Sequence, residues 1–166
     1  MKKIHKAAII AAIVALFLII LGISISEDYE SPKERLYKAI RRDDLQTVKN
    51  VIEKYPELID EYENSSLSAR IFDTSSDTPL GEACKYMKVP IIQYLVESGV
   101  YDIDAVCGSE GETALICAAK RDNGISAIKV LLDHGADKTI KDDNGKTAYD
   151  YAVENGNTEL AEVLKY

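Results

Sequence analysis

The sequence predicts an all-α solenoid, in which helix pairs stack along the chain and one apolar helix precedes them. Threonine recurs at Thr78, Thr113 and Thr147, which stand 35 and 34 residues apart. An alanine follows each of these threonines after five residues, and two short apolar stretches follow in every copy. A unit of this length that repeats along a chain is typical of stacked helix pairs, which bury their apolar faces only against their neighbours.

The first element is the apolar N-terminal segment MKKIHKAAIIAAIVALFLIILGISIS, residues 1–26. Twenty uncharged residues, 7–26, follow three lysines. A helix of that length spans roughly 30 Å, which is the hydrocarbon thickness of a bilayer. The segment is therefore either an uncleaved transmembrane anchor or a signal peptide cleaved near Ser26, where small residues precede Glu27.

Both alternatives predict the same side of the membrane for the rest of the chain, residues 27–166. The three lysines stay on the cytoplasmic side, so the acidic body is exported. We expect the body to be held at the membrane through residues 7–26, facing the periplasm or the cell surface. The alternative is a secreted or periplasmic protein released by cleavage.

Four repeats are predicted after this segment, at about residues 31–73, 74–110, 111–144 and 145–166. The first copy, ERLYKAIRRDDLQTVKNVIEKYPELID, is the weakest, because Glu34 stands in the threonine position. The connection that follows it is longer than one period by about 11 residues. Its extra length, residues 60–77, is either a flexible loop or an enlarged finger that meets a partner through apolar side chains, namely Tyr62, Leu67, Ile71 and Phe72.

The three later copies carry start and stop signals for helices. Thr78 predicts an N-cap, and Pro79 at the first helical position loses no hydrogen bond that the helix needs. We expect second helices over residues 90–97, 126–133 and 158–166. Gly99 and Gly135 predict that the first two of these end in left-handed geometry.

The segments TPLGEACKYMKVPIIQYLVESG and TALICAAKRDNGISAIKVLLDHGAD resemble the ankyrin repeat, and the resemblance covers about residues 31–166. The family's histidine after Thr-Pro-Leu is replaced by Gly81, Ile116 and Asp150, so we expect poorer hydrogen bonding between helices. The resemblance implies a non-enzymatic module without a cofactor or small-molecule substrate. It would bind another protein, as a scaffold or as an inhibitor.

The resemblance also implies where a partner would bind. In the family, contacts come from the two positions after the paired alanines and from the turn before the threonine. The helix positions here hold Arg41, Arg42, Lys85, Tyr86, Lys120 and Arg121. The turn positions hold Asp77, Glu110, Glu112 and Asp143, with Lys146 as the basic exception. This pattern suggests a basic ladder flanked by acidic turns, suited to a partner with an acidic patch; the alternative is a set of ordinary solvated side chains.

The charge of the chain argues against nucleic acid as a partner. Three of the 20 basic residues lie in residues 1–26, which leaves 17 basic against 28 acidic residues, or −11, in the body. Such a field repels phosphates. The Gly145-Lys146-Thr147 triplet is no phosphate loop, because the glycine that such a loop requires is Ile140 here. Calcium is not expected either, since Lys141 stands where a carboxylate is needed. We interpret residues 143–146 as a turn between repeats.

Cys84, Cys107 and Cys117 form no C-x-x-C pair, so no zinc site is expected. They are either two packed small side chains plus one loop thiol, or Cys107 forms a disulfide with Cys117 or with Cys84 in an oxidising compartment. His134 stands at a predicted helix end, where it can contact terminal carbonyl groups. It has no partner residue that would indicate catalysis.

Overall fold

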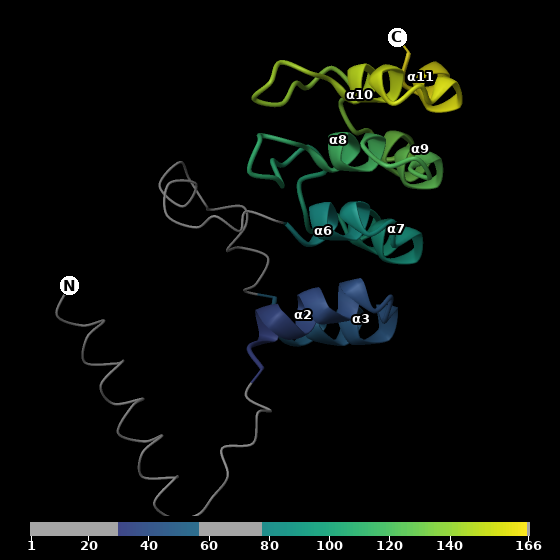
Figure 1. Ribbon diagram of the computed structural model, residues 1–166. Helices are drawn as coiled ribbons and strands as arrows, with labels where there is room; N and C mark the ends of the chain where they lie inside the picture. The colour runs from purple at the N-terminus through teal and green to yellow at the C-terminus, as the bar shows by residue number, and fades with distance from the viewer. Residues whose placement is uncertain (1–29, 57–77, 166) are drawn as a thin grey trace, which may run out of the picture. The chain divides into compact units, whose positions relative to one another are not determined.

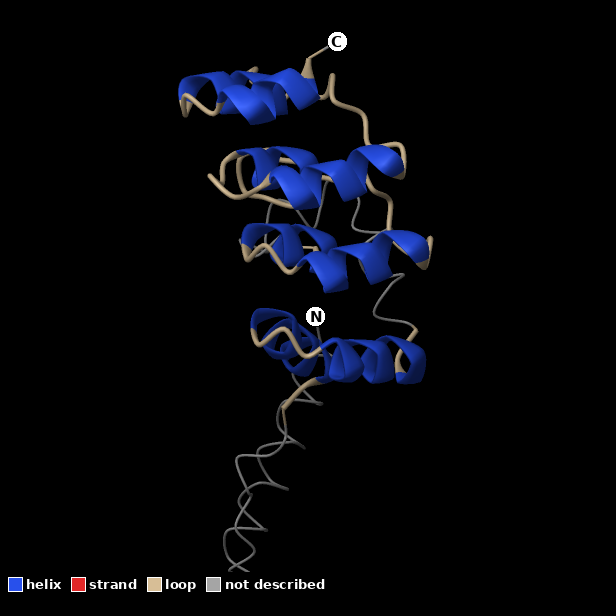
Figure 2. Ribbon diagram, turned by 90° about the vertical axis from the view of Figure 1, so that its right-hand side faces the viewer, coloured by secondary structure: helices blue, strands red, loops and turns tan. Residues whose placement is uncertain are grey.

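The computed structural model describes residues 30–56 and 78–165, and from Pro32 onward these belong to one compact unit. They form α-helices in four consecutive pairs (Figure 1). The part of the chain that the structure describes is drawn as helices and loops without a strand (Figure 2). Its only strand-like pairing is a single β-bridge between Val106 and Thr113. The prediction of an all-α repeat fold is confirmed. The pairs are α2 (Pro32–Arg41) with α3 (Leu45–Lys54), α6 (Pro79–Lys85) with α7 (Val89–Glu97), α8 (Ala114–Ala119) with α9 (Ile125–Asp133), and α10 (Ala148–Glu154) with α11 (Thr158–Leu164).

Each pair packs against the next pair in chain order. The first helices α2, α6, α8 and α10 contact one another in that order, and the second helices α3, α7, α9 and α11 do the same. The aliphatic side chains between them form one apolar cluster that includes residues of all four pairs. The largest of its fully buried members are Leu36, Ile40, Leu80, Ile91, Ile92, Leu95, Leu115, Ile116, Ile128, Leu131, Leu160 and Leu164.

The recurring threonines are the N-caps of the first helices, as predicted. The Thr78 hydroxyl accepts a hydrogen bond from the Gly81 amide at 3.0 Å, and the Thr113 hydroxyl accepts one from Ile116 at 3.4 Å. Thr147 and Asp150 form a capping box, in which the Thr147 amide donates to the Asp150 carboxylate at 2.8 Å. These bonds satisfy amides that an isolated helix start would leave unpaired.

Left-handed residues end the helices. Gly99 has a φ of 61° and Gly135 a φ of 90°, which confirms the two predicted stops. In every pair except α8–α9, the turn between the two helices also contains a left-handed residue, which the sequence analysis did not predict. Its φ is 62° at Asp43, 53° at Met87 and 70° at Gly156. Only the last of these positions has the glycine that this conformation favours.

Gly81 is required for a different reason, the close approach of the segment that leads to α8. A Cβ atom at this position would lie 2.4 Å from the Cys107 Cβ and 2.5 Å from its Sγ. Cys107 is buried in the segment that leads to α8, so this segment places a side chain over the first turn of α6. This is the position where the family has its histidine, and Cys107 takes up that space.

Residues 1–29 and 57–77 lie outside the described residues. The predicted apolar helix, the membrane segment 7–26 and the candidate finger of residues 60–77 all fall there. Within the described ranges, no helix has both the length and the apolar character needed to span a bilayer.

Candidate functional site

The predicted basic side chains stand at the ends of the first helices. Arg41 is the last residue of α2, Lys85 is the last residue of α6, and Lys120 caps the C-terminus of α8. Arg42, Tyr86 and Arg121 follow them directly and are exposed. Because α2, α6 and α8 pack on one another in order, these positions follow one edge of the stack.

Arg41 contacts a carboxylate of the next repeat. Its Nε atom lies 3.5 Å from the Glu82 carboxylate and donates to the Tyr37 carbonyl oxygen at 3.3 Å. Glu82 lies in the first turn of α6 and is only 4% exposed. A carboxylate that deeply buried requires a counter-ion, because removing it from water costs several kcal/mol. Arg41 therefore serves the contact between repeats one and two.

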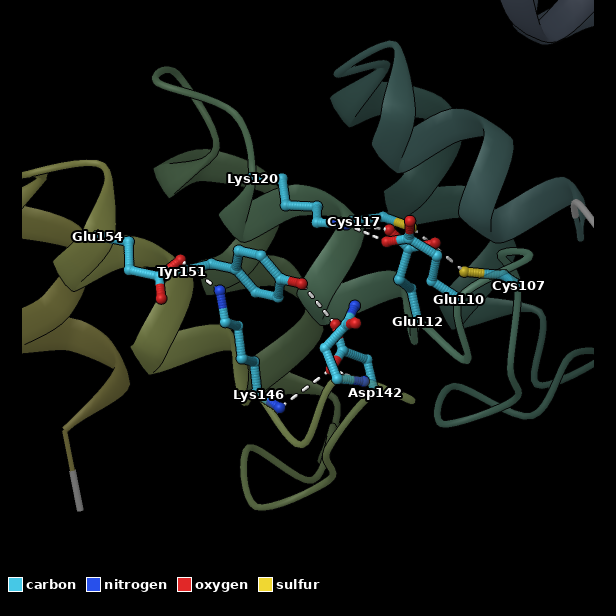
Figure 3. A network of polar contacts seen from close by, with 10 residues as sticks. Cys107, Glu110, Glu112, Cys117, Lys120, Asp142, Lys146, Tyr151 and Glu154 are labelled. Atoms are coloured by element: carbon cyan, nitrogen blue, oxygen red, sulfur yellow. Dashed lines mark hydrogen bonds and ion pairs between the residues drawn. The ribbon is translucent and has the colours of Figure 1, made fainter.

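Lys120 is paired with the acidic turn of its own repeat. It forms ion pairs with Glu112 and, at 3.3 Å, with Glu110. Partial burial would lower the pKa of Lys120, but the hydrogen bond and charge of Glu112, reinforced by Glu110, hold it well above its usual range. Glu110 and Glu112 are thus not two independent acidic side chains of the turn, because both carboxylates contact Lys120 (Figure 3).

A pocket of about 160 Å³ lies between the end of α6 and repeat three. Three cations and one carboxylate line it, so positive charge is in excess there although the whole chain carries −8. Such a pocket can hold a carboxylate or another small anion through charge-assisted hydrogen bonds. Its lining residues are Lys85, Cys107, Gly108, Ser109, Glu112, Cys117, Lys120 and Arg121.

Asp142 organises the turn between repeats three and four. It is 6% exposed and accepts hydrogen bonds from the amides of Asn144 at 2.9 Å and Lys146 at 3.0 Å. The Tyr151 hydroxyl donates to its second oxygen at 2.5 Å. Burial raises the pKa of Asp142, but the bond from Tyr151 and the two amide bonds outweigh it and lower the pKa. The turn at residues 143–146 is therefore an inter-repeat turn, as predicted.

Tyr151 of α10 contacts two lysines, Lys120 at the end of α8 and Lys146 in the turn before α10. The Lys120 Nζ lies 4.7 Å from the centre of the Tyr151 ring and the Lys146 Nζ lies 5.3 Å from it (Figure 3). Lys146 also pairs with Glu154 at 2.8 Å. These cation–π contacts connect the basic pocket to the last repeat.

The remaining residues that the sequence analysis singled out are Asp143, Asp77 and His134. The Asp143 amide donates to the Glu110 carbonyl oxygen at 2.8 Å, so the turns before α8 and α10 are linked through their backbones. Asp77 lies outside the described residues. The His134 Nδ1 lies 2.8 Å from the Val130 carbonyl oxygen at the end of α9, which confirms the predicted helix-end contact.

The cysteines differ from the expected arrangement. Cys84 and Cys107 are buried, at 0% and 1% exposed, whereas the half-buried Cys117 lies in the helix α8 and not in a loop. All three are free thiols, and the sulfur atoms of Cys107 and Cys117 lie 3.6 Å apart. Among the described residues, no group of three His, Cys, Asp or Glu side chains could hold a metal ion.

The sequence analysis missed Glu82, Asp142 and Tyr151. A signal for Glu82 existed, since a charged residue between Leu80 and Ala83 falls on the buried face of a helix and must have a partner. Asp142 precedes Asn144-Gly145 by two residues, which is typical of an aspartate that closes a turn. Nothing in the sequence indicated that Tyr151 reaches back to it.

Residues 36–142 and 100–166 match the family model for ankyrin repeats in three copies. The chain is 32% identical over 114 residues, 65% of its length, to zinc finger CCCH domain-containing protein 29 of Arabidopsis thaliana. It is 28% identical over 139 residues, 82% of its length, to ankyrin repeat and SAM domain-containing protein 6 of the rat. It is 40% identical over 85 residues, 51% of its length, to human SH3 and multiple ankyrin repeat domains protein 2. The matched segments cover 19%, 14% and 4% of these three relatives.

Proposed function

Since the chain belongs to the ankyrin-repeat family, we propose that it binds a protein partner that places an acidic side chain in the basic pocket beside Arg121. Ankyrin repeats are protein–protein interaction modules and are typically not enzymes. The observation that carries the proposal is the excess of positive charge in the pocket of an otherwise acidic chain. Opposite charges at an interface speed association and exclude partners of the wrong sign.

The surroundings of the pocket supply residue types that stabilise interfaces. Arg121 is exposed beside it, and Tyr86, next to the lining residue Lys85, is 45% exposed. Arginine and tyrosine are enriched among the side chains whose truncation weakens protein complexes most. Arg41 and Lys120 contribute less to partner selection, because each already neutralises a carboxylate within the chain.

Reversing the charge of Arg121 tests the proposal. The partner is first isolated by cross-linking to the full chain, and its affinity is then measured by titration. Arg121→Glu is expected to weaken binding at least about tenfold, which corresponds to about 1.4 kcal/mol, through repulsion of the acidic side chain. Helical content should stay unchanged, because Arg121 is exposed and makes no ion pair among the described residues.

Lys129→Glu is the matched control, because Lys129 is an exposed cation on the second helix α9. Its affinity should equal that of the unmodified chain. Normal binding by Arg121→Glu, or an equal loss in both variants, would contradict the assignment of the pocket.

We further propose that the module is displayed outside the cytoplasmic membrane, where it acts as a scaffold or an inhibitor. The support is the run of 20 uncharged residues, 7–26, after three lysines. Tethering would raise the concentration of the repeats near membrane-bound partners without any new contact.

The N-terminus of the mature protein distinguishes anchor from signal peptide. We expect the protein in the membrane fraction to retain residues 1–26, as measured by terminal sequencing and intact mass. A soluble form that starts at Glu27 would establish the cleaved, secreted alternative and exclude the tether.

A further inference from the structure

We propose that Cys107 and Cys117 form a reversible disulfide when the folded protein meets a small-molecule disulfide such as oxidised glutathione. Their sulfur atoms lie 3.6 Å apart, and the bond requires about 2.05 Å. The sulfur atoms therefore need to approach by roughly 1.5 Å, which is within the reach of side-chain rotation. The two residues stand on different elements, Cys107 before α8 and Cys117 within it.

The two thiols have different access to solvent, which assigns them different roles. Cys117 is half-buried and lines the basic pocket together with Lys120 and Arg121. The cations of the pocket attract an anionic oxidant to the position where Cys117 can meet it. Cys107 also lines the pocket but is 1% exposed, so it meets only a sulfur that is already attached to Cys117.

The protonation of Cys107 agrees with its role as the second thiol to react. The contact with Cys117, followed by burial, holds the pKa of Cys107 well above its usual range. Cys107 therefore remains a thiol while Cys117 attacks the oxidant. Cys84 is fully buried in α6, does not line the pocket, and serves as an internal reference.

The reaction is a pair of thiol–disulfide exchanges. The Cys117 thiolate attacks one sulfur of oxidised glutathione, the glutathione S–S bond breaks, and one glutathione leaves as a thiol after taking up a proton. Cys107 then loses its proton and attacks the Cys117 sulfur, and the second glutathione leaves as a thiol. Two electrons and two protons pass from the protein to the oxidant, and the reverse exchange restores both thiols.

The bond would join the segment before α8 to the helix itself. Cys107 also packs over Gly81 in the first turn of α6, so the pair lies where α6 meets the segment before α8. Because both cysteines line the basic pocket, their oxidation would alter the wall of that pocket.

The test is oxidation of the folded full chain with oxidised glutathione, followed by alkylation and mass spectrometry. Trypsin releases one peptide, residues 89–120, that contains both Cys107 and Cys117, and a separate peptide, residues 71–85, that contains Cys84. We expect the first peptide to lose two hydrogen atoms and to regain them on reduction. Cleavage after Glu110 and Glu112 then separates the two cysteines, so the fragments stay joined only while the disulfide is intact.

The single variants identify the order of the steps. Cys107→Ser should accumulate a stable mixed disulfide on Cys117, because the thiol that resolves it is absent. Cys117→Ser should leave Cys107 unmodified, since it is buried. Two free cysteines, a mixed disulfide that persists in the unmodified chain, or a bond to Cys84 would each overturn the proposal. The measurement on the unmodified chain decides the question even if a variant fails to fold.

Discussion

Replacing Gly81 with alanine is expected to lower the free energy of unfolding by about 3 kcal/mol. Helix propensity predicts the opposite sign, because alanine in a helix is favoured over glycine by up to about 1 kcal/mol. The steric effect should dominate. The new Cβ would lie 2.4 Å from the Cys107 Cβ, and both positions are buried, so the backbones of α6 and the segment before α8 must move apart. Urea denaturation followed by circular dichroism measures the change.

A second substitution separates this clash from a general intolerance of position 81. Cys107→Gly removes the atoms that the new methyl group would meet, so adding it to Gly81→Ala should recover part of the lost stability. The two changes should therefore couple by about 2 kcal/mol in a double-mutant cycle. An alanine variant that matches or exceeds the original chain in stability would show that the segment before α8 does not approach α6 as described.

Asp142→Ala is expected to cost about 2–3 kcal/mol, the second largest effect. The substitution removes the acceptor for two backbone amides, those of Asn144 and Lys146, and for the Tyr151 hydroxyl. Buried donors without a partner typically cost about 1–3 kcal/mol. Asp142→Asn retains one oxygen and should cost less. Asp143→Ala changes the exposed neighbour and should have little effect, which makes it the control; equal losses at both positions would contradict the role of Asp142.

The contribution of Asp142 to the free energy of unfolding should decrease at low pH. The hydrogen bonds lower the pKa of Asp142 in the folded protein, so its contribution is fully present above the unfolded value of about 3.9. It is lost as the pH falls through the lower folded value. The stability difference between the original chain and Asp142→Asn should therefore narrow as the pH falls below about 4, as measured by urea denaturation across that range. A difference that stays constant in acid would exclude a charged Asp142 as its source.

The helix pairs could be predicted from the sequence because their signals are local. Thr78, Thr113 and Thr147 cap the helices that directly follow them, and Gly99 ends the helix that directly precedes it. The left-handed turn between α6 and α7 was missed because Met87 occupies a conformation that normally indicates glycine. A rule based on residue type fails where the surrounding structure holds a residue other than glycine in a left-handed conformation.

The candidate site could be predicted only as a set of positions. The spacing of the repeats places Arg41 and Lys120 at equivalent helix ends, but it does not indicate which carboxylate each would contact. Arg41 pairs with Glu82, 41 residues further along the chain, because α6 packs on α2. Likewise, the pocket forms where α6 meets the segment before α8, so its cysteines and cations come together only once two repeats are in contact.

The contact of Cys107 with Gly81 also limits how this protein could change over generations. Side chains at positions 81 and 107 would share one space, so we expect a larger residue at position 81 to be tolerated only after a smaller one has appeared at position 107. Recombination that exchanged α6 alone for a copy bearing the family's histidine would bring in a side chain for which Cys107 leaves no space. We therefore expect α6 and the segment before α8 to be inherited together, even though a repeated architecture suggests modules that can be freely reshuffled.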